Sequence, residues 1–395
     1  MKIIHTSDWH LGKVLYNQEL TPNHEAFLQQ LYSIVQEQRP DALLISGDIY
    51  ETSNPSVLAQ KLFHSSILQL HNAAPQMKII IISGNHDSAQ RVSIGSDLWR
   101  LANVHIITSI HTLDDRSADY DQHIIPITDS NGETLALIGA IPFAYEQNFP
   151  KVTDSHNRIL AFYEGLCHRM HELNPQRKPQ VLMGHLTISG DLDFTGHKLD
   201  AIGGMESLDV SNIVPEFDYL ALGHIHHAQF IHNTQHKVRY CGTPIAVSFD
   251  EDYNHSVSIV TFDDQNHPNV EEHLIQTPHL LETIPKQPQP FDEALKELAT
   301  YPSDQDNYLR LNVIAGTAPS DAMALATAKM EGKQAELLCI NYTRTKEMEK
   351  STDVPITLSE FNELTPLQVA KRYLGDQFTE EMETTFNEVL QQLND

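Results

Sequence analysis

The chain has 395 residues, of which 40% are hydrophobic and 7% aromatic, and this composition is typical of a folded globular protein with more than one domain. Its 26 Lys and Arg face 53 Asp and Glu, giving a formal net charge of −27, and its three cysteines lie far apart in the sequence. These values exclude a disulfide framework and a CxxC metal site, and so acidic a chain should repel nucleic acid at long range.

The first 275 or so residues repeat one pattern, in which a short β-branched run ends in a small polar cluster and a helix or loop follows. Helices are predicted from Thr21, as the N-cap, to about Gln38, and from Pro55 to about His71. The alternation predicts an α/β layered domain with ligands at the carboxyl ends of its strands. The runs that predict doubly buried strands are KIIHTSDWH (2–10), DALLISGD (41–48), MKIIIISGNHD (77–87), QVLMGH (180–185) and YLALGHIHH (219–227).

The second predicted helix has five apolar positions, Val57, Leu58, Leu62, Ile67 and Leu68. No stretch of about 18 apolar residues predicts a membrane span, and the apolar run at the N-terminus is too short for a signal peptide. We therefore expect a soluble protein of the cytoplasm.

The composition changes at QTPHLLETIPKQPQPFDE (276–293), where prolines predict a linker or domain boundary. A helix (291–299), a strand (308–314), a helix (320–331) and a strand (335–342) then predict a small α/β module. The charged stretch 343–353 precedes a tail whose last helix carries an apolar stripe. We expect three parts: a domain at 1–275, the small module at 278–343, and a linker with helical tail at 344–395.

Polar side chains follow the predicted strands in a regular way. On an extended segment residues two apart point in the same direction, so Asp8 with His10, and His224 with His226, can each aim at one place. A lone His or Asp at a strand end is more often a structural hydrogen-bonding residue, but five such clusters in order are not explained in that way. The candidates are Asp8, His10, Asp48, Asn85, His86, Asp87, His185, His224 and His226.

Oxygen and imidazole donors without thiolates suit manganese, iron, zinc or nickel. The donors other than His86 and Asp87 are too many for one ion, whereas two ions about 3.5–4 Å apart, with one bridging carboxylate, would fit. With so few anionic ligands the site would stay positive and could accept a phosphate diester. His86 is then the natural proton donor to the leaving oxygen, and Asp87 either orients it or caps a helix.

The ordered set DWH, GD, GNHD, GH and GHIH resembles the calcineurin-like metallophosphoesterases. Longer stretches, HTSDWHLGK, SGNHDS, ALGHIHHAQ and YCGTPIAVSFDE, resemble within them the nuclease subunits of a bacterial double-strand-break nuclease complex. The resemblance implies a four-layer metallophosphoesterase β-sandwich flanked by helices and two Mn²⁺ ions, with Mg²⁺ or other divalent ions as substitutes. It implies Asp8, His10, Asp48 and His226 as ligands of one ion. Asp48, Asn85, His185 and His224 would hold the other, and His86 would be the catalytic histidine.

The same resemblance implies a 3′–5′ exonuclease on duplex ends and an endonuclease on single strands and hairpins, in DNA recombination and repair. The partner would be an ATPase with a long coiled coil, bound by the tail, while the 278–343 module would be a capping domain that presents DNA. A homodimer through helices such as 55–71 would sit within a heterotetramer. Because the loop at 187–201 has little positive charge, we expect the partner to supply much of the DNA affinity.

Two other functions compete with this interpretation. A phosphomonoesterase or cyclic-nucleotide phosphodiesterase would share every ligand, although it would have no evident use for the C-terminal residues. A DNA-end tether with structural metals would not need His86. For His5, His197 and His227 structural roles are expected.

Overall fold

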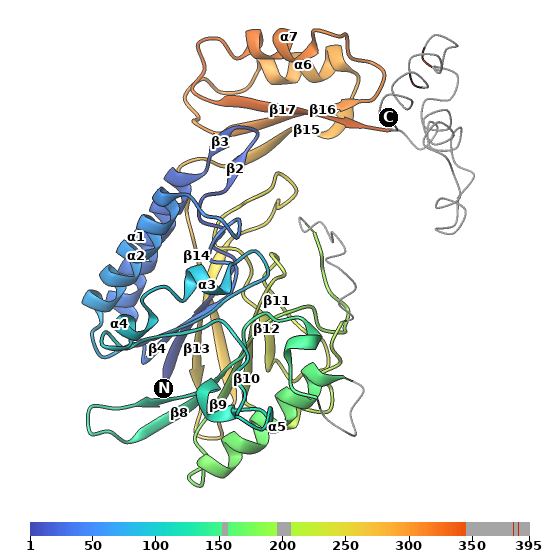
Figure 1. Ribbon diagram of the computed structural model, residues 1–395. Helices are drawn as coiled ribbons and strands as arrows, with labels where there is room; N and C mark the ends of the chain where they lie inside the picture. The colour runs from blue at the N-terminus through green and yellow to red at the C-terminus, as the bar shows by residue number, and fades with distance from the viewer. Residues whose placement is uncertain (152–156, 196–206, 345–381, 383–385, 387–395) are drawn as a thin grey trace, which may run out of the picture.

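The computed structural model describes residues 1–151, 157–195 and 207–344, together with Met382 and Phe386. Two six-stranded sheets pack face to face and helices cover their outer faces, so the α/β expectation and the four layers are confirmed (Figure 1). Among the helices that the structure describes, none combines the length and the apolar character needed to cross a membrane.

The first sheet holds a parallel core to which two antiparallel strands are added at one edge. Its strand order is β14 (Pro268–Leu274), β13 (Ser256–Phe262), β1 (Lys2–Thr6), β4 (Ala42–Ser46), β5 (Lys78–Ile82) and β6 (Val104–Ile107). Helices α1 (Thr21–Gln38) and α2 (Val57–Ala73) pack on its outer face, with the short α3 (Ala89–Val92) and α4 (Ser96–Arg100) nearby.

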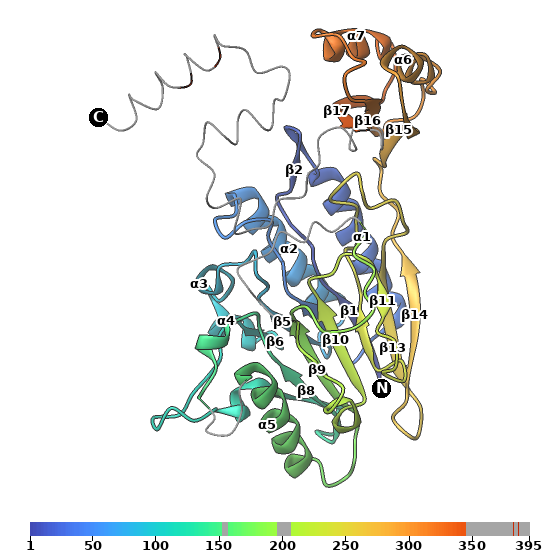
Figure 2. The ribbon, with the colours of Figure 1, turned by 90° about the vertical axis from the view of Figure 1, so that its right-hand side faces the viewer.

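The second sheet has four parallel strands between antiparallel edges. Its order is β11 (Gln229–Phe230), β12 (Val238–Tyr240), β10 (Tyr219–Gly223), β9 (Gln180–His185), β8 (Thr134–Ala140) and β7 (Ile124–Thr128). Helix α5 (Arg158–Leu173) covers its outer face (Figure 2). Short 3₁₀ turns occur at Tyr120–His123, Glu146–Asn148 and Val214–Glu216.

The core between the sheets is aliphatic. Ile80 and Ile82 of the first sheet meet Val181 and Met183 of the second, all of them fully buried. Such continuous apolar runs are what strands buried on both faces require. This packing fixes the two sheets against each other and brings the carboxyl ends of β1, β4, β5, β9 and β10 to one side of the sandwich.

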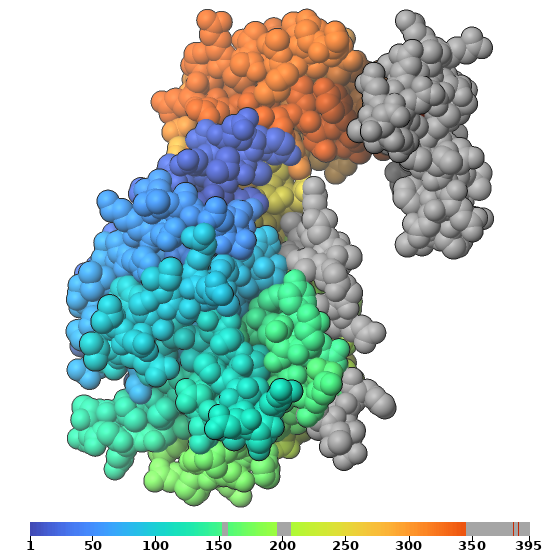
Figure 3. Space-filling view, viewed as in Figure 1, coloured from blue at the N-terminus to red at the C-terminus, as the bar shows by residue number. Residues whose placement is uncertain are grey.

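The C-terminal module, residues 278–343, is a three-stranded parallel sheet with helices on one face and its own core. Its elements are β15 (Leu281–Gln289), α6 (Phe291–Ala299), β16 (Tyr308–Ile314), α7 (Ala322–Lys329) and β17 (Glu336–Thr343). It lies above the sandwich, next to the hairpin of β2 (Val14–Leu15) and β3 (Gln18–Glu19) (Figure 3).

Three details of the sequence prediction are wrong. Leu20, not Thr21, is the N-cap of α1, and it makes no side-chain cap. The proline-rich stretch contains strand β15, which tolerates Pro285 and Pro288 because it lies at a sheet edge and is irregular between residues 284 and 289. In α2 the apolar positions do not face the core as a set, since Val57 is 82% exposed.

Candidate metal centre and active site

The predicted donors lie where strands of both sheets end. β1, β4 and β5 lead to Asp8, His10, Asp48 and Asn85, whereas β9 and β10 lead to His185, His224 and His226. Asp8, His10, Asp48 and His224 have φ of 53°, 47°, 50° and 97°, a left-handed backbone that non-glycine residues adopt at a cost of about 1–3 kcal/mol each. The expected extended geometry is therefore wrong, and tight turns aim these side chains instead.

Close approach of the two sheets explains Gly47, which precedes Asp48. Its φ is +88°, and a Cβ atom there would collide with the ring of His185. The turn is also tied to the neighbouring one, because the Asp8 amide donates to the Gly47 carbonyl oxygen at 2.9 Å and the His10 amide to that of Asp48 at 3.0 Å. The two carboxylates are thus positioned by main-chain contacts.

Asp8, His10 and His226 form the first candidate position. Each offers one ligand atom, and these atoms lie within 4.8 Å of one another. The Nε2 atoms of His10 and His226 are 3.2 Å apart. Both Nδ1 atoms are already engaged: that of His10 lies 2.9 Å from Glu51 Oε2, and that of His226 lies 2.8 Å from Glu251 Oε1. A ring that donates its Nδ1 proton to a carboxylate presents the Nε2 lone pair to a metal.

Asn85, His185 and His224 form the second candidate position. Asn85 Oδ1 is 3.0 Å from His185 Nε2 and 3.0 Å from His224 Nδ1. His185 Nδ1 is 2.8 Å from the carbonyl oxygen of Ser46, so the main chain of β4 orients this ring. His224 and His226, expected to aim at one place, instead reach different positions.

Asp48 lies between the two positions. Its Oδ2 is 3.3 Å from His185 Nε2 and 3.9 Å from His10 Nε2, so one carboxylate oxygen approaches a ligand of each position. Asp8 belongs to the first group and also forms a compact group with Asp48 and His185. Buried oxygen and imidazole donors that converge in this way fit two divalent cations that share a carboxylate.

Burial and charge act against each other in this cluster. Burial opposes ionisation of Asp48, yet the positive charge and hydrogen bond of His185 hold its pKa well below the usual range. Burial likewise disfavours the charged His185, but Asp48 raises the pKa of this ring to about 9. Burial and then the charge of His10 lower the pKa of His226 to about 3, which keeps this ring neutral and able to act as a ligand.

His86 stands beside the cluster and lines the cleft. Its amide donates to Asp48 Oδ1 at 2.9 Å, and its Nδ1 lies 2.8 Å from the Glu51 carbonyl oxygen. Asp87 does not take the expected place at this ring. Its carboxylate accepts from the amides of Gly84, Ile49 and Tyr50 at 2.9–3.1 Å and so ties the turn after β5 to the turn after β4. It caps no helix either, because Ser88 is the N-cap of α3.

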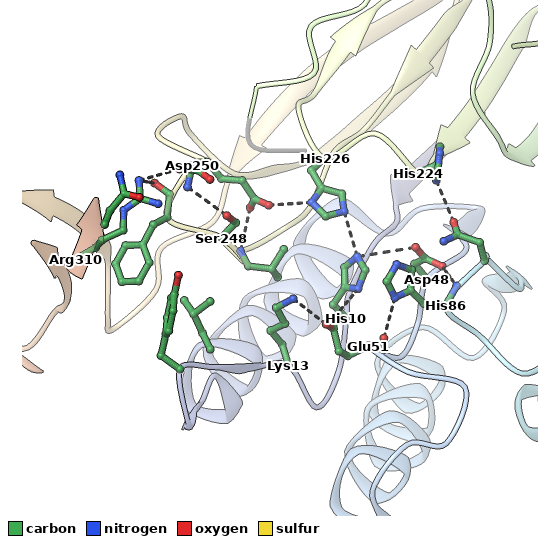
Figure 4. A pocket seen from close by; sticks show the side chains of 17 residues that line it. His10, Lys13, Asp48, Glu51, His86, His224, His226, Ser248, Asp250 and Arg310 are labelled. Carbon is green, nitrogen blue, oxygen red and sulfur yellow. Dashed lines mark hydrogen bonds and ion pairs between the residues drawn. The ribbon is translucent and has the colours of Figure 1, made fainter. Parts of the chain in front are cut away.

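Sequence reasoning missed two carboxylates, Glu51 and Glu251. Each backs an imidazole from a loop, and neither follows an apolar run that would have marked it. Both line a cleft of about 630 Å³ that runs from the metal centre to the C-terminal module (Figure 4). Lys13 and Arg310 also line this cleft, and each is paired with a carboxylate, Lys13 with Glu51 and Arg310 with Asp250.

Other histidines lie outside the cluster. His5 is fully buried, with Nδ1 3.0 Å from the Tyr219 hydroxyl. His227 pairs with Asp193 and stacks on Tyr253 with ring centroids 4.3 Å apart. His197 and nearly all of the predicted helical tail at 344–395 fall outside the described residues.

Comparison with known proteins bears on two parts of the chain. The family model of calcineurin-like phosphoesterases matches residues 1–228, more than half of the chain. A second model, described as the type 5 capsule protein repressor C-terminal domain, matches residues 278–378. The first match contains all of the predicted donors.

Among curated proteins, three SbcD subunits of SbcCD nucleases are similar to this chain. That of Rhodobacter capsulatus is 31% identical over 274 residues, 66% of each chain. That of Escherichia coli K12 is 30% identical over 289 residues, 69% of this chain and 67% of the relative. That of Staphylococcus epidermidis is 34% identical over 254 residues, 64% of this chain and 63% of the relative. The match thus spans about two thirds of the length of these relatives.

Proposed function

Because this chain belongs to the SbcD family of calcineurin-like phosphoesterases, we propose that it is a nuclease that hydrolyses phosphodiester bonds in DNA with two metal ions. The observation that carries the proposal is the position of Asp48 between two sets of buried nitrogen and oxygen donors. We propose Mn²⁺ as the ion, with Mg²⁺ or other divalent ions as substitutes, because these donors suit such cations. In a site of this kind two ions supply an activated water and neutralise charge on the phosphate.

The chain's own groups would then orient the substrate and move a proton. His86 is held by its Nδ1 on the Glu51 carbonyl oxygen, which leaves Nε2 for a proton transfer to the leaving oxygen. Asp87 acts on this step only by fixing the turn that carries His86. We expect His86→Leu to keep both metal ions and to lose cleavage, and retained cleavage would remove His86 from the mechanism.

Charge in the cleft favours a nuclease that depends on a partner. Of its described lining residues, Lys13 and Arg310 are the basic ones, and both are neutralised by carboxylates. Phosphate recognition would therefore rest on the bound cations, and affinity for long DNA on another subunit. We propose the SbcC ATPase as that subunit, bound through the segment 344–395, for 3′–5′ exonuclease action on duplex ends and endonuclease action on single strands and hairpins.

A cleavage assay would test the proposal. An end-labelled hairpin duplex is incubated with the purified chain in Mn²⁺, in Mg²⁺ or in chelator, with and without SbcC and ATP, and a nitrophenyl phosphate monoester serves as the competing substrate. We expect Mn²⁺-dependent cutting of the hairpin that SbcC and ATP enhance. Hydrolysis of the monoester without any cutting of DNA would favour a phosphomonoesterase instead.

We also propose that the chain forms a homodimer through α2 and α4. Val57 is 82%, Leu98 74% and Leu101 86% exposed, which is unusual for apolar side chains so close together. The ring of His64 in α2 stacks on Trp99 in α4 with centroids 5.8 Å apart, so the two helices are neighbours. Light scattering should give twice the chain mass, reduced to one chain mass by Val57→Asp. An unchanged mass in the variant would rule out this surface.

A further inference from the structure

One loop, Val247–Tyr253, lies between the metal centre and the C-terminal module. Its residues Val247 to Glu251 line the cleft together with His226 on one side and Arg310 on the other (Figure 4). Consecutive acidic side chains of this loop face opposite ways: Glu251 contacts His226, whereas Asp250 contacts Arg310. The loop therefore touches both a candidate ligand and the module.

The inward contact is buried and has two anchors. Glu251 is 5% exposed, and its Oε1 accepts from His226 Nδ1 at 2.8 Å. Its Oε2 accepts from the amide of Val247 at 2.9 Å, so the loop's own main chain holds the carboxylate in place. Any shift of this loop would therefore move the acceptor that fixes the His226 ring.

The outward contact joins the loop to the module. Phe249 is buried in a small apolar cluster with Leu20 of the sandwich and Tyr308 of β16. The Arg310 guanidinium lies over the Phe249 ring, 5.2 Å from its centroid, and its Nη2 is 2.8 Å from Asp250 Oδ1. A second pair, Lys286 with Asp252 at 2.7 Å, is largely exposed and contributes little.

We propose that Glu251 is a positioning residue for His226, and that the C-terminal module, through Arg310 and the Val247–Tyr253 loop, sets the metal affinity of the first position. The inference rests on the proposed two-metal site. A carboxylate that accepts from the distal nitrogen of a histidine ligand fixes its tautomer and orientation, and loss of such a partner costs about 10–100-fold in metal affinity. Arg310 acts one step further away, by seating the loop that carries this carboxylate.

The test is a calorimetric titration of the full chain with Mn²⁺. Glu251→Gln should weaken one of two binding events roughly 10–100-fold, because the new amide NH₂ or its carbonyl must face either Val247 N–H or His226 N–H unfavourably. Arg310→Met, which keeps the apolar stem, should weaken the same event by about threefold to tenfold. Lys286→Met is the matched control, with the same module and loop but an exposed pair, and should bind as the wild type does.

A second background shows which position responds. In His226→Asn, which leaves only the second position intact, Arg310→Met should have no further effect on Mn²⁺ affinity. Thermal melting of each variant without metal separates a local effect from unfolding. Wild-type affinity in Arg310→Met, or an equal loss in Lys286→Met, would overturn the coupling. A wild-type chain that binds two ions tightly but cuts no DNA would remove the proposed function and leave this inference standing.

Discussion

The two candidate metal positions differ in what holds their histidines. In the first, the rings of His10 and His226 are backed by carboxylate side chains on loops, Glu51 and Glu251. In the second, the ring of His185 is backed by the main-chain carbonyl oxygen of Ser46, the last residue of β4. A main-chain contact inside a packed sheet varies little with the surroundings, whereas a loop carboxylate transmits what happens to the loop.

This difference indicates a division of roles. The second position is built into the core where the two sheets meet, and its geometry depends on packing that also holds the domain together. The first position is joined through Glu251 to the C-terminal module and through Glu51 to Lys13 at the cleft wall. We therefore expect the first position to be tunable by parts of the molecule that touch DNA or a partner, and the second to be constant.

The largest effect should come from the residue that both positions share. Asp48→Asn removes the charge of an oxygen that approaches His185 and His10, so we expect weaker Mn²⁺ binding at both positions and cleavage at background. Metal content after dialysis and hairpin cleavage would measure this. Asp252→Asn, an exposed carboxylate near the same cleft, is the control and should change neither. Loss of only one ion in Asp48→Asn would assign Asp48 to a single position.

Next in size is the removal of one backing group. Glu51→Gln should weaken Mn²⁺ binding at the first position roughly 10–100-fold and leave the second unchanged, because His185 does not depend on a side chain for its orientation. The matched change at the second position is Ser46→Ala, which keeps the backing carbonyl and should bind both ions normally. If Ser46→Ala weakened binding as much as Glu51→Gln, the contrast between the positions would be wrong.

The pH dependence should be dominated by the second position. Burial works against the charged ring, but Asp48 raises the pKa of His185 to about 9, and a metal replaces the proton on Nε2. Below that pH binding must therefore release this proton, and affinity should fall about tenfold for each unit of pH. Calorimetry at about pH 7.5 in buffers of different ionisation enthalpy would count the protons. His185→Asn should remove more proton release than His226→Asn, since the pKa of His226 is about 3 because of burial.

The smallest effect is expected at the cleft wall. Lys13 Nζ lies 2.7 Å from Glu51 Oε1, and both side chains are partly exposed. Lys13→Met should lower Mn²⁺ affinity at the first position by only a few fold, because a partly solvated pair contributes little. A loss as large as that in Glu51→Gln would mean that the lysine, not the carboxylate, controls His10.

The sequence was sufficient for the donors and insufficient for what supports them. Asp8, Asp48 and His185 each follow or end a β-branched run, and in a sandwich of parallel strands such ends come together. Glu51 and Glu251 carry no local signal, because their roles arise from contacts with His10 and His226 across the fold. The same limit applies to the turns, since no pattern in the sequence revealed the left-handed backbone at four donors.

Helix α2 shows a different reason for error. Its core-facing residues include Ala59 and Ser66, which hydropathy does not mark, while Val57 and Leu58 point outward. Hydropathy alone assigns every apolar residue of a helix to the core, although exposed apolar side chains are also what an interface between chains requires. Strand β15 escapes prediction because prolines usually indicate a break, whereas an edge strand can contain them.

The central claim is that the donors form two metal positions that share Asp48, and the most direct test is the number of Mn²⁺ ions bound per chain in a calorimetric titration of the purified wild type. The account predicts two ions for the wild type, and one for His226→Asn with the affinity of the remaining ion unchanged. A single ion in the wild type, or two ions that both persist in His226→Asn, would contradict it.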